Sequence, residues 1–254
     1  MSEPKSEWQT KELATGYLEG VRGSIPGAEL QFAVIDRILQ SWCHAPSRIL
    51  DLGCGDGILG HRLLKTFPLA HGIFVDFSGP MLDAAQKKVS SLAKAKVVKA
   101  DFASPQWMDV VTSYQPFDIV ISGLAIHHLS HERKKALYSE IYDLLVRDGV
   151  FLNLEHVASC TPAGEELFDD FFIDHLHNFH TATDPGTTRE SIANTYYHRP
   201  DKKENILASV NEQCGWLREI GFNDVDCFFK VFELALFGGR KILNPDTGTD
   251  PEKR

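Results

Sequence analysis

The chain has 254 residues, of which 43% are hydrophobic and 24% charged, and its formal net charge is −9. This composition fits one large α/β domain, or one domain with an added cap. Because binding to a phosphate backbone requires clustered Lys and Arg, the negative charge argues against a nucleic-acid partner and favours a small-molecule substrate.

The cysteine content and the lack of long apolar runs indicate the cellular setting. The five cysteines are odd in number and form no C-x-x-C pair, so the sequence indicates neither a disulfide framework nor a zinc site. No apolar run reaches the roughly 18 residues of a membrane span, and MSEPKSEWQT lacks the features of a signal peptide. We therefore expect a soluble, cytoplasmic protein with no membrane contact.

Two helices are predicted ahead of the first strand, at residues 7–22 and 28–41. Apolar side chains recur at helical spacing in the second, at Leu30, Val34, Ile35, Ile38 and Leu39. Residues 1–44 are therefore expected to form a helical lid.

Strand and helix patterns alternate from residue 48 to residue 155. Repeated β-α-β units form a parallel sheet with right-handed crossovers, so the carboxyl ends of the strands meet at one edge, where a ligand belongs. Residues 45–159 are thus predicted to be a ligand-binding core. The predicted strands are 48–52, 72–76, 96–100, 117–122 and 149–155, and the predicted helices between them are 57–66, 79–92, 105–113 and 131–146.

The first strand runs directly into a turn with three glycines, in the segment RILDLGCGDG. Glycine tolerates the positive φ angles of a tight turn and lets the backbone approach a ligand closely. The pattern is not a dinucleotide fingerprint, because Ile58 stands where the third glycine of G-x-G-x-x-G belongs, and no G-K-[ST] follows. We predict a turn that binds a ligand without cradling phosphates; the alternative is a set of glycines that only shapes the turn.

Acidic residues follow four of the five predicted strands, at Asp51, Asp76, Asp101 and Glu155, and the fourth strand ends at Ser122. Asp76 lies 25 residues after Asp51. In dinucleotide folds a carboxylate at this position accepts the hydroxyls of a ribose. We therefore predict that Asp76 binds a ribose.

After the fifth strand the alternation stops. Residues 160–205 include an aromatic and histidine-rich stretch, GEELFDDFFIDHLHNFH. Because an insertion at the carboxyl edge lies over the ligand site, we predict that this segment forms a substrate cap.

The C-terminal part is predicted to complete the core. Residues 206–241 contribute most of a helix at 203–220 and two antiparallel strands at 224–231 and 233–239. The polar tail at 242–254 has no periodicity and is expected to be disordered.

The acidic residue ahead of G-x-G-x-G resembles motif I of class I S-adenosylmethionine (SAM) methyltransferases, and FDIVISGLAIHHL resembles the fourth-strand motif of that family. The resemblance covers about residues 45–156. It implies an α/β fold with a seven-stranded, mostly parallel, doubly wound sheet. It also implies an enzyme that transfers a methyl group from SAM to a small molecule and releases S-adenosylhomocysteine (SAH).

The same resemblance implies which residues contact SAM. The lid faces the carboxylate of SAM, Asp101 and Phe102 hold the adenine, and the end of the fourth strand passes beneath the sulfonium. For the two lid residues, Tyr17 and Arg22, packing and surface roles are the alternative. The full predicted set is Tyr17, Arg22, Asp51, Gly53, Gly55, Asp76, Phe77, Asp101, Phe102, Ser122 and Gly123.

Methyl transfer from a sulfonium needs alignment, exclusion of water and in some cases one base. Histidine titrates near neutral pH and can take a proton from an oxygen or nitrogen nucleophile. Glu155 and His156 lie at the same predicted edge as the histidine pair after strand four and are further candidates for the base. For the histidine pair, simple packing is the alternative. The predicted catalytic residues are His127, His128, His175 and Tyr196.

A metal site is not predicted in the cap. His177 and His180 share a helix face, but His175 points elsewhere, so the three do not form a ligand set.

Three outlying segments resemble the carboxy-SAM synthase of tRNA wobble-uridine modification: RGSIPGAELQF, GEELFDDFF and SVNEQCGWLREIGF. That subgroup places an arginine in the last segment to pair with the added carboxylate, whereas Trp216 or, after a shift of two residues, Arg218 stands here. The alternatives to methyl transfer are therefore a cofactor-modifying enzyme of this type and a noncatalytic SAM-binding protein. A homodimer is compatible with each.

Overall fold

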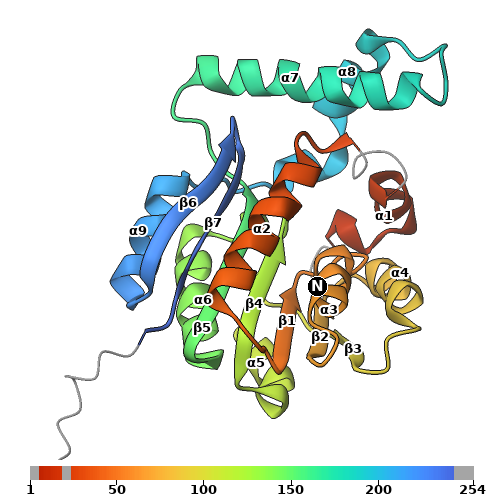
Figure 1. The fold of residues 1–254 in the computed structure, drawn as a ribbon. Coiled ribbons are helices and arrows are strands. Elements are labelled where there is room, and N and C mark those ends of the chain that lie inside the picture. The colour runs from red at the N-terminus through yellow and green to blue at the C-terminus, as the bar shows by residue number, and fades with distance from the viewer. Residues whose placement is uncertain (1–5, 19–23, 243–254) are drawn as a thin grey trace, which may run out of the picture.

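The computed structural model of the chain describes residues 6–18 and 24–242 (Figure 1). The predicted contact of Arg22 lies outside the described residues. So does nearly all of the tail that is predicted to be disordered. Across the described residues, the chain contains no helix with both the length and the apolar character needed to cross a membrane.

The centre of the fold is a seven-stranded sheet in the order β3-β2-β1-β4-β5-β7-β6. The first five strands run parallel, and β7 is antiparallel to both β5 and β6. This confirms the predicted seven-stranded, mostly parallel sheet. The strands are β1 (Arg48–Leu52), β2 (His71–Asp76), β3 (Ala95–Lys99), β4 (Phe117–Gly123), β5 (Leu145–His156), β6 (Asn223–Val231) and β7 (Leu234–Arg240).

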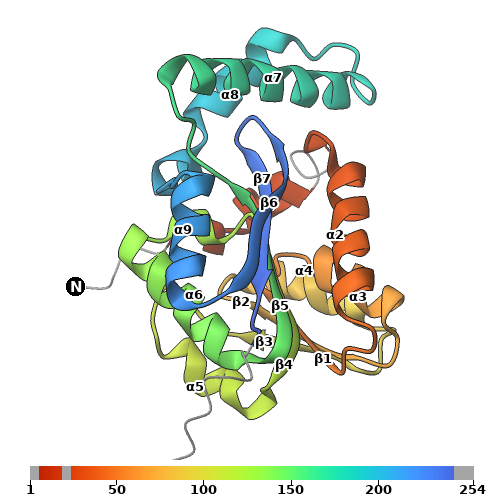
Figure 2. The same ribbon diagram turned by 60° about the vertical axis from the view of Figure 1, so that its left-hand side comes forward.

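Helices cover both faces of the sheet and give three layers (Figure 2). Each face carries its own apolar core, because the β-strands are buried on both sides. One face is covered by α2 (Ala28–Trp42), α3 (Ile58–Thr66) and α4 (Gly79–Val89), and the other by α5 (Trp107–Val111), α6 (His131–Leu144) and α9 (Val210–Ile220).

The prediction of one continuous helix at residues 7–22 is wrong, because the helix is interrupted at Thr10. A 3₁₀ helix, η1 (Glu7–Gln9), ends there, and α1 (Lys11–Gly16) begins after it. Thr10 has extended backbone angles and its hydroxyl accepts a hydrogen bond from the Leu13 N–H (3.4 Å). Thr10 is therefore an N-cap and not a helix interior residue.

The predicted helix at residues 203–220 also begins too early. The described helix α9 starts at Val210, after a capping box in which the Ser209 side chain accepts from the Glu212 N–H and the Glu212 carboxylate accepts from the Ser209 N–H. Residues 200–204 form a separate 3₁₀ helix, η6. The reciprocal cap fixes the helix start at Ser209.

The inserted segment lies across the carboxyl end of the sheet (Figures 1 and 2). It consists of α7 (Pro162–Thr181), α8 (Arg189–His198) and η6 (Pro200–Glu204). Its apolar side chains pack together and onto Leu234, and the Phe171 ring lies 5.2 Å from the Phe232 ring, centroid to centroid. The cap is therefore anchored on the turn between β6 and β7.

Candidate active site

The carboxyl ends of the parallel strands surround a cavity of about 480 Å³, which we call the cofactor cavity. Its size is within the range of small-molecule sites. Residues from the lid, from β1 to β4 and from the loops after these strands line it. Most of the predicted cofactor residues are among them, namely Tyr17, Asp51, Gly53, Gly55, Asp76, Phe77, Asp101, Phe102 and Gly123.

Ser122 is the described member of the predicted set that does not line this cavity. It is fully buried inside the sheet, in register with Leu52 on β1 and Asn153 on β5. The cavity wall begins at the next residue, Gly123.

The glycines of the first turn have the backbone angles that require glycine. Gly53 has φ +66° and Gly55 has φ +53°, both in the left-handed region. A Cβ on Gly53 would lie 2.3 Å from the Ala125 Cβ and 3.3 Å from the Phe102 ring. Gly53 is therefore needed for contact between protein segments, in addition to any contact with a ligand.

Asp76 is buried at the end of β2 and organises this turn. Its Oδ2 accepts a hydrogen bond from the Gly55 N–H (2.9 Å) and its Oδ1 accepts one from the Ser78 N–H (2.8 Å). Burial raises the pKa of the Asp76 carboxyl. Each carboxylate oxygen has a further lone pair, so the group can shape the turn and still accept hydrogen bonds from a diol.

Asp101 is exposed and lines the cofactor cavity just after β3, the strand that pairs with β2. Its Oδ1 accepts a hydrogen bond from the Ala103 N–H (2.9 Å), so it stabilises the turn after β3. The predicted contact with an adenine would use the remaining lone pairs of the same carboxylate.

The lid is attached on two sides of the cofactor cavity. The Ser78 hydroxyl donates to the Trp8 carbonyl (2.6 Å), next to the turn that Asp76 holds. On the other side, the Glu204 carboxylate accepts from the Ser6 hydroxyl (2.8 Å) and the Glu7 N–H (3.0 Å). These contacts connect the cofactor turn to the cap through the lid.

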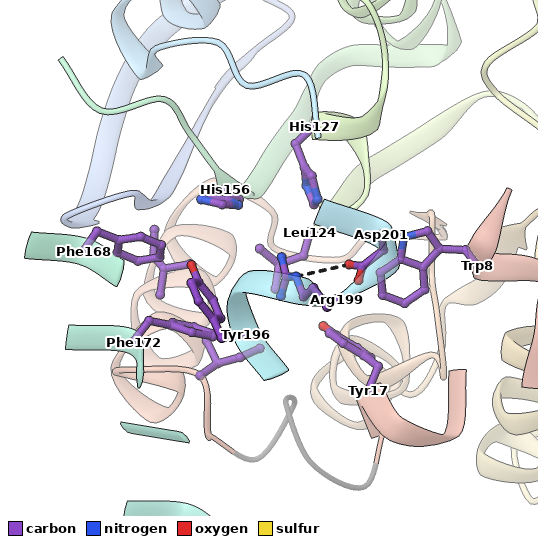
Figure 3. A pocket seen from close by; sticks show the side chains of 12 residues that line it. Trp8, Tyr17, Leu124, His127, His156, Phe168, Phe172, Tyr196, Arg199 and Asp201 are labelled. Carbon is purple, nitrogen blue, oxygen red and sulfur yellow. Dashed lines mark ion pairs between the residues drawn. The ribbon is translucent and has the colours of Figure 1, made fainter. Parts of the chain in front are cut away.

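A second, smaller cavity of about 70 Å³ adjoins the first; we call it the reaction chamber (Figure 3). It shares Trp8, Tyr17, Ile25 and Leu124 with the cofactor cavity. Leu124 has φ +52°, an uncommon value for a branched side chain and one often found at functional sites. The rest of the chamber wall is His127, His156, Phe168, Phe172, Tyr196, Arg199, Asp201 and Leu234.

The reaction chamber contains a buried histidine–carboxylate pair. His127 Nδ1 lies 2.6 Å from Glu155 Oε1, and Glu155 is fully buried. Burial raises the pKa of the Glu155 carboxyl to about 7 and lowers the pKa of His127 well below its usual value. The bond fixes the ring, and within the described residues the outer Nε2 has no hydrogen-bond partner. This nitrogen is the group in the chamber best suited to take a proton.

His128 belongs to the wall of the cofactor cavity. Its ring lies 4.0 Å from the His127 ring and 5.8 Å from the Trp8 ring, centroid to centroid. Burial lowers the pKa of His128 to about 3. His128 thus packs between the His127 ring and the lid and does not line the reaction chamber.

The two candidates from the cap differ in position. Tyr196 lines the reaction chamber, but its hydroxyl donates to Asp169 Oδ1 (2.6 Å), and burial raises the pKa of its phenol. His175 lies outside both cavities, with its Nδ1 2.9 Å from the carbonyl of Phe171 on the same helix. The structure therefore brings His127, His128 and Tyr196 together and leaves His175 apart.

The sequence did not predict several residues that lie in or near the wall of the reaction chamber. Trp8 belongs to a short lid element, and Arg199 and Asp201 form an ion pair (3.5 Å) in the link between α8 and η6. Glu233 lies 2.7 Å from His156 in the turn before β7. Trp8, Arg199 and Asp201 reach the chamber wall, and Glu233 reaches His156, only because segments distant in the sequence pack together.

The position that distinguishes carboxy-SAM synthases lies on α9, away from both cavities. Trp216 packs against the core beside His131, with ring centroids 5.8 Å apart. The Arg218 guanidinium donates to the Val225 carbonyl (2.9 Å). Neither side chain lines the cofactor cavity or the reaction chamber.

Solved structures share this fold. An O-methyltransferase family protein from Burkholderia thailandensis has a TM-score of 0.59 at 15% identity, over 86% of this chain and 58% of that chain. The structure of PigF with SAH has a TM-score of 0.60 at 15% identity, over 95% of this chain and 64% of that chain. The chain thus spans less than two thirds of the length of these neighbours. At this identity the likeness defines one class of fold, that of the methyltransferases.

Sequence comparisons give the family. The family described as "Methyltransferase domain" matches residues 49–149. A protein of a Geobacillus species that is assigned to the methyltransferases is 39% identical over 84% of this chain and 89% of its own length. The carboxy-S-adenosyl-L-methionine synthase of a Nitratiruptor species is 26% identical over 89% of this chain and 90% of its own length. The chain belongs to the class I SAM-dependent methyltransferases.

The buried Glu155 carboxyl makes stability depend on pH. Its pKa rises from the ordinary 4.5 to about 7 on folding, so its contribution is fully present below pH 4.5 and is lost as the pH rises through 7. Glu155→Gln removes this pH-dependent loss of stability, because the Gln side chain does not titrate. We expect the free energy of unfolding of the variant, relative to the wild type, to rise by about 3 kcal/mol from pH 4.5 to pH 8. Urea unfolding at each pH measures this, and a constant difference would contradict it.

Proposed function

We propose that this protein transfers the methyl group of SAM to an oxygen of a small molecule, with His127 as the general base. The observation that carries the proposal is the His127–Glu155 pair in a chamber that shares a wall with the cofactor cavity. A base is needed where the nucleophile meets the cofactor, and the position of His127 beside the cofactor cavity supports this role.

The cofactor cavity fits SAM in shape and chemistry. The glycine turn allows close approach of the backbone, the buried Asp76 can accept two hydroxyls, and the Phe102 ring offers an apolar face. Bound SAM supplies an activated methyl group on a sulfonium. Tyr17 and Leu124 line both cavities, so the methyl group would face the reaction chamber past these two side chains.

The residues of the chamber would then act on the acceptor. His127 Nε2 takes the proton from the acceptor hydroxyl, while the hydrogen bond to Glu155 holds the ring and stabilises the charge that forms. The apolar side chains of Leu124, Phe168 and Phe172 exclude water from the nucleophile. Alignment and dehydration are what an in-line methyl transfer needs from the protein.

The names of related proteins support an oxygen acceptor. The malonyl-[acyl-carrier protein] O-methyltransferase of Legionella pneumophila is 40% identical over 83 residues, which is 33% of this chain. The Burkholderia neighbour is likewise described as an O-methyltransferase family protein. The homodimer and the cytoplasmic location stay predictions.

A carboxy-SAM synthase activity is the second candidate, because relatives with that name match most of the chain. The placement of Trp216 and Arg218 away from both cavities argues against it. We expect that ligand released by denaturing freshly purified protein has the mass of SAM or SAH. Mass spectrometry that instead finds a carboxylated adduct would favour the second candidate.

Asp76 tests the orientation of the cofactor. Asp76→Ala should weaken SAM binding by about 1.5 to 3 kcal/mol, because a charge-assisted hydrogen bond is lost and partner groups are left unpaired. Calorimetry with SAM measures the change, and Asp83→Ala, an exposed carboxylate on α4, is the matched control. Unchanged SAM affinity in Asp76→Ala would refute the assignment, and NAD should not bind to the wild type.

His127 tests the chemistry. His127→Gln should lower kcat roughly 10²- to 10⁴-fold, the range for loss of a general base, while the affinity for SAM is kept. SAH formation with a panel of small phenols gives kcat, and calorimetry gives the affinity. His71→Gln, at the exposed amino end of β2, is the matched control and should keep full turnover. If His127→Gln turns over like the wild type, the base lies elsewhere.

A further inference from the structure

The reaction chamber contains a second histidine–carboxylate pair. His156 Nε2 lies 2.7 Å from Glu233 Oε2, and Glu233 is only 3% exposed. The rings of His127 and His156 are 5.8 Å apart, centroid to centroid, and both line the chamber (Figure 3). A single proton transfer needs one base, so the second pair requires an explanation.

The placement of Glu233 points to function more than to stability. It occupies the turn between β6 and β7, where the preceding Phe232 has φ +48°, an unfavourable angle for an aromatic residue. A buried carboxylate is itself costly unless it is well paired. The turn directs Glu233 inward, where it accepts hydrogen bonds from the Ser159 hydroxyl and contacts His156. The positive φ of Phe232 is what a two-residue hairpin requires at its first residue, whereas the buried carboxylate of Glu233 is explained by its contact with the imidazole.

The contact with Glu233 determines what His156 can do. With Nε2–H donating to the carboxylate, the neutral ring presents Nδ1 as an acceptor. Among the residues that the structure describes, none makes a hydrogen bond to this nitrogen. His127 Nε2 is an acceptor by the same logic. The chamber thus offers two acceptors, on rings close enough for hydrogen bonds to hydroxyls on neighbouring carbons.

The size of the chamber limits what enters it. Its volume of about 70 Å³ is below the roughly 150 Å³ of a cavity that holds benzene, so only the edge of a ring fits. The chamber also shares Trp8, Tyr17, Tyr196, Arg199 and Asp201 with an outer cavity of about 460 Å³ between the lid and the cap. The wall of this outer cavity is mostly apolar and includes Leu13, Leu176 and Ile192.

We propose that the acceptor is an aromatic ring with two neighbouring hydroxyls and an apolar substituent, and that His156, held by Glu233, binds the hydroxyl that is not methylated. The substituent lies in the outer cavity. This inference rests on the proposed function for its chemistry. His127 takes the proton of one hydroxyl, that oxygen bonds to the methyl carbon, and the carbon–sulfur bond breaks to leave neutral SAH.

The test compares 4-butylcatechol with 4-butylphenol, which lacks only the second hydroxyl. We expect the wild type to prefer the catechol by roughly 100-fold in kcat/KM, because a site built to bind a hydroxyl rejects the analogue without it. In His156→Phe the preference should fall close to one, because kcat/KM for the catechol falls far more than kcat/KM for the phenol. Glu233→Gln should reduce the preference partially, because it keeps the ring but weakens its orientation.

Binding to SAH-loaded protein, measured by calorimetry, separates the two proposals. If no methyl transfer occurs but the wild type binds the catechol more tightly and His156→Phe does not, the recognition stands and the methyltransferase proposal falls. If both probes are methylated equally, or the preference survives in His156→Phe, the recognition is refuted and the proposed function stands. If neither probe binds, the recognition is likewise refuted. A purely structural role of His156 would not change the ratio between the probes.

Discussion

The buried carboxylate of Glu155 is the group on which the rest of the site depends. It is the penultimate residue of β5, contacts His127 and accepts a hydrogen bond from the His156 N–H (2.9 Å). A buried carboxylate must be held by its surroundings, and these two contacts hold its Oε1. The buried ammonium of Lys134 donates to the carbonyls of Leu129 and Ile206 (2.6 Å for the latter), so it ties the histidine turn to the segment before α9.

The site is shared between the core and its insertions. The first histidine pair joins the 3₁₀ helix at Ile126–His128, after β4, to the end of β5, whereas the second joins the end of β5 to the turn before β7. The cap adds Tyr196 and Arg199, and the lid adds Trp8 and Tyr17. The lid is bonded both to Ser78 at the cofactor turn and to Glu204 in η6, so it connects the core to the inserted segment.

Sequence alone predicted the parts that follow from regular geometry. Parallel strands bring their carboxyl ends together, which is why Asp51, Asp76 and Asp101 line one cavity as expected. The start of α9 was predicted at residue 203, which is too early, although Ser209 and Glu212 have the spacing of a capping box. The contact of Glu233 with His156 could not be predicted. It depends on the register of β5 and β7, which pairs His156 with Leu234 although the two strands are distant in the sequence.

The order of the residues along the cavities gives an acceptor one orientation. His127 stacks on His128, which lines the cofactor cavity, so its base lies on the cofactor side. His156 packs on Phe168 of the cap (5.3 Å between centroids) and does not line the cofactor cavity. We therefore expect a hydroxyl beside His127 to lie nearer the methyl donor than one beside His156. In the proposed function the two imidazoles differ in role because their neighbours differ, although their own chemistry is the same.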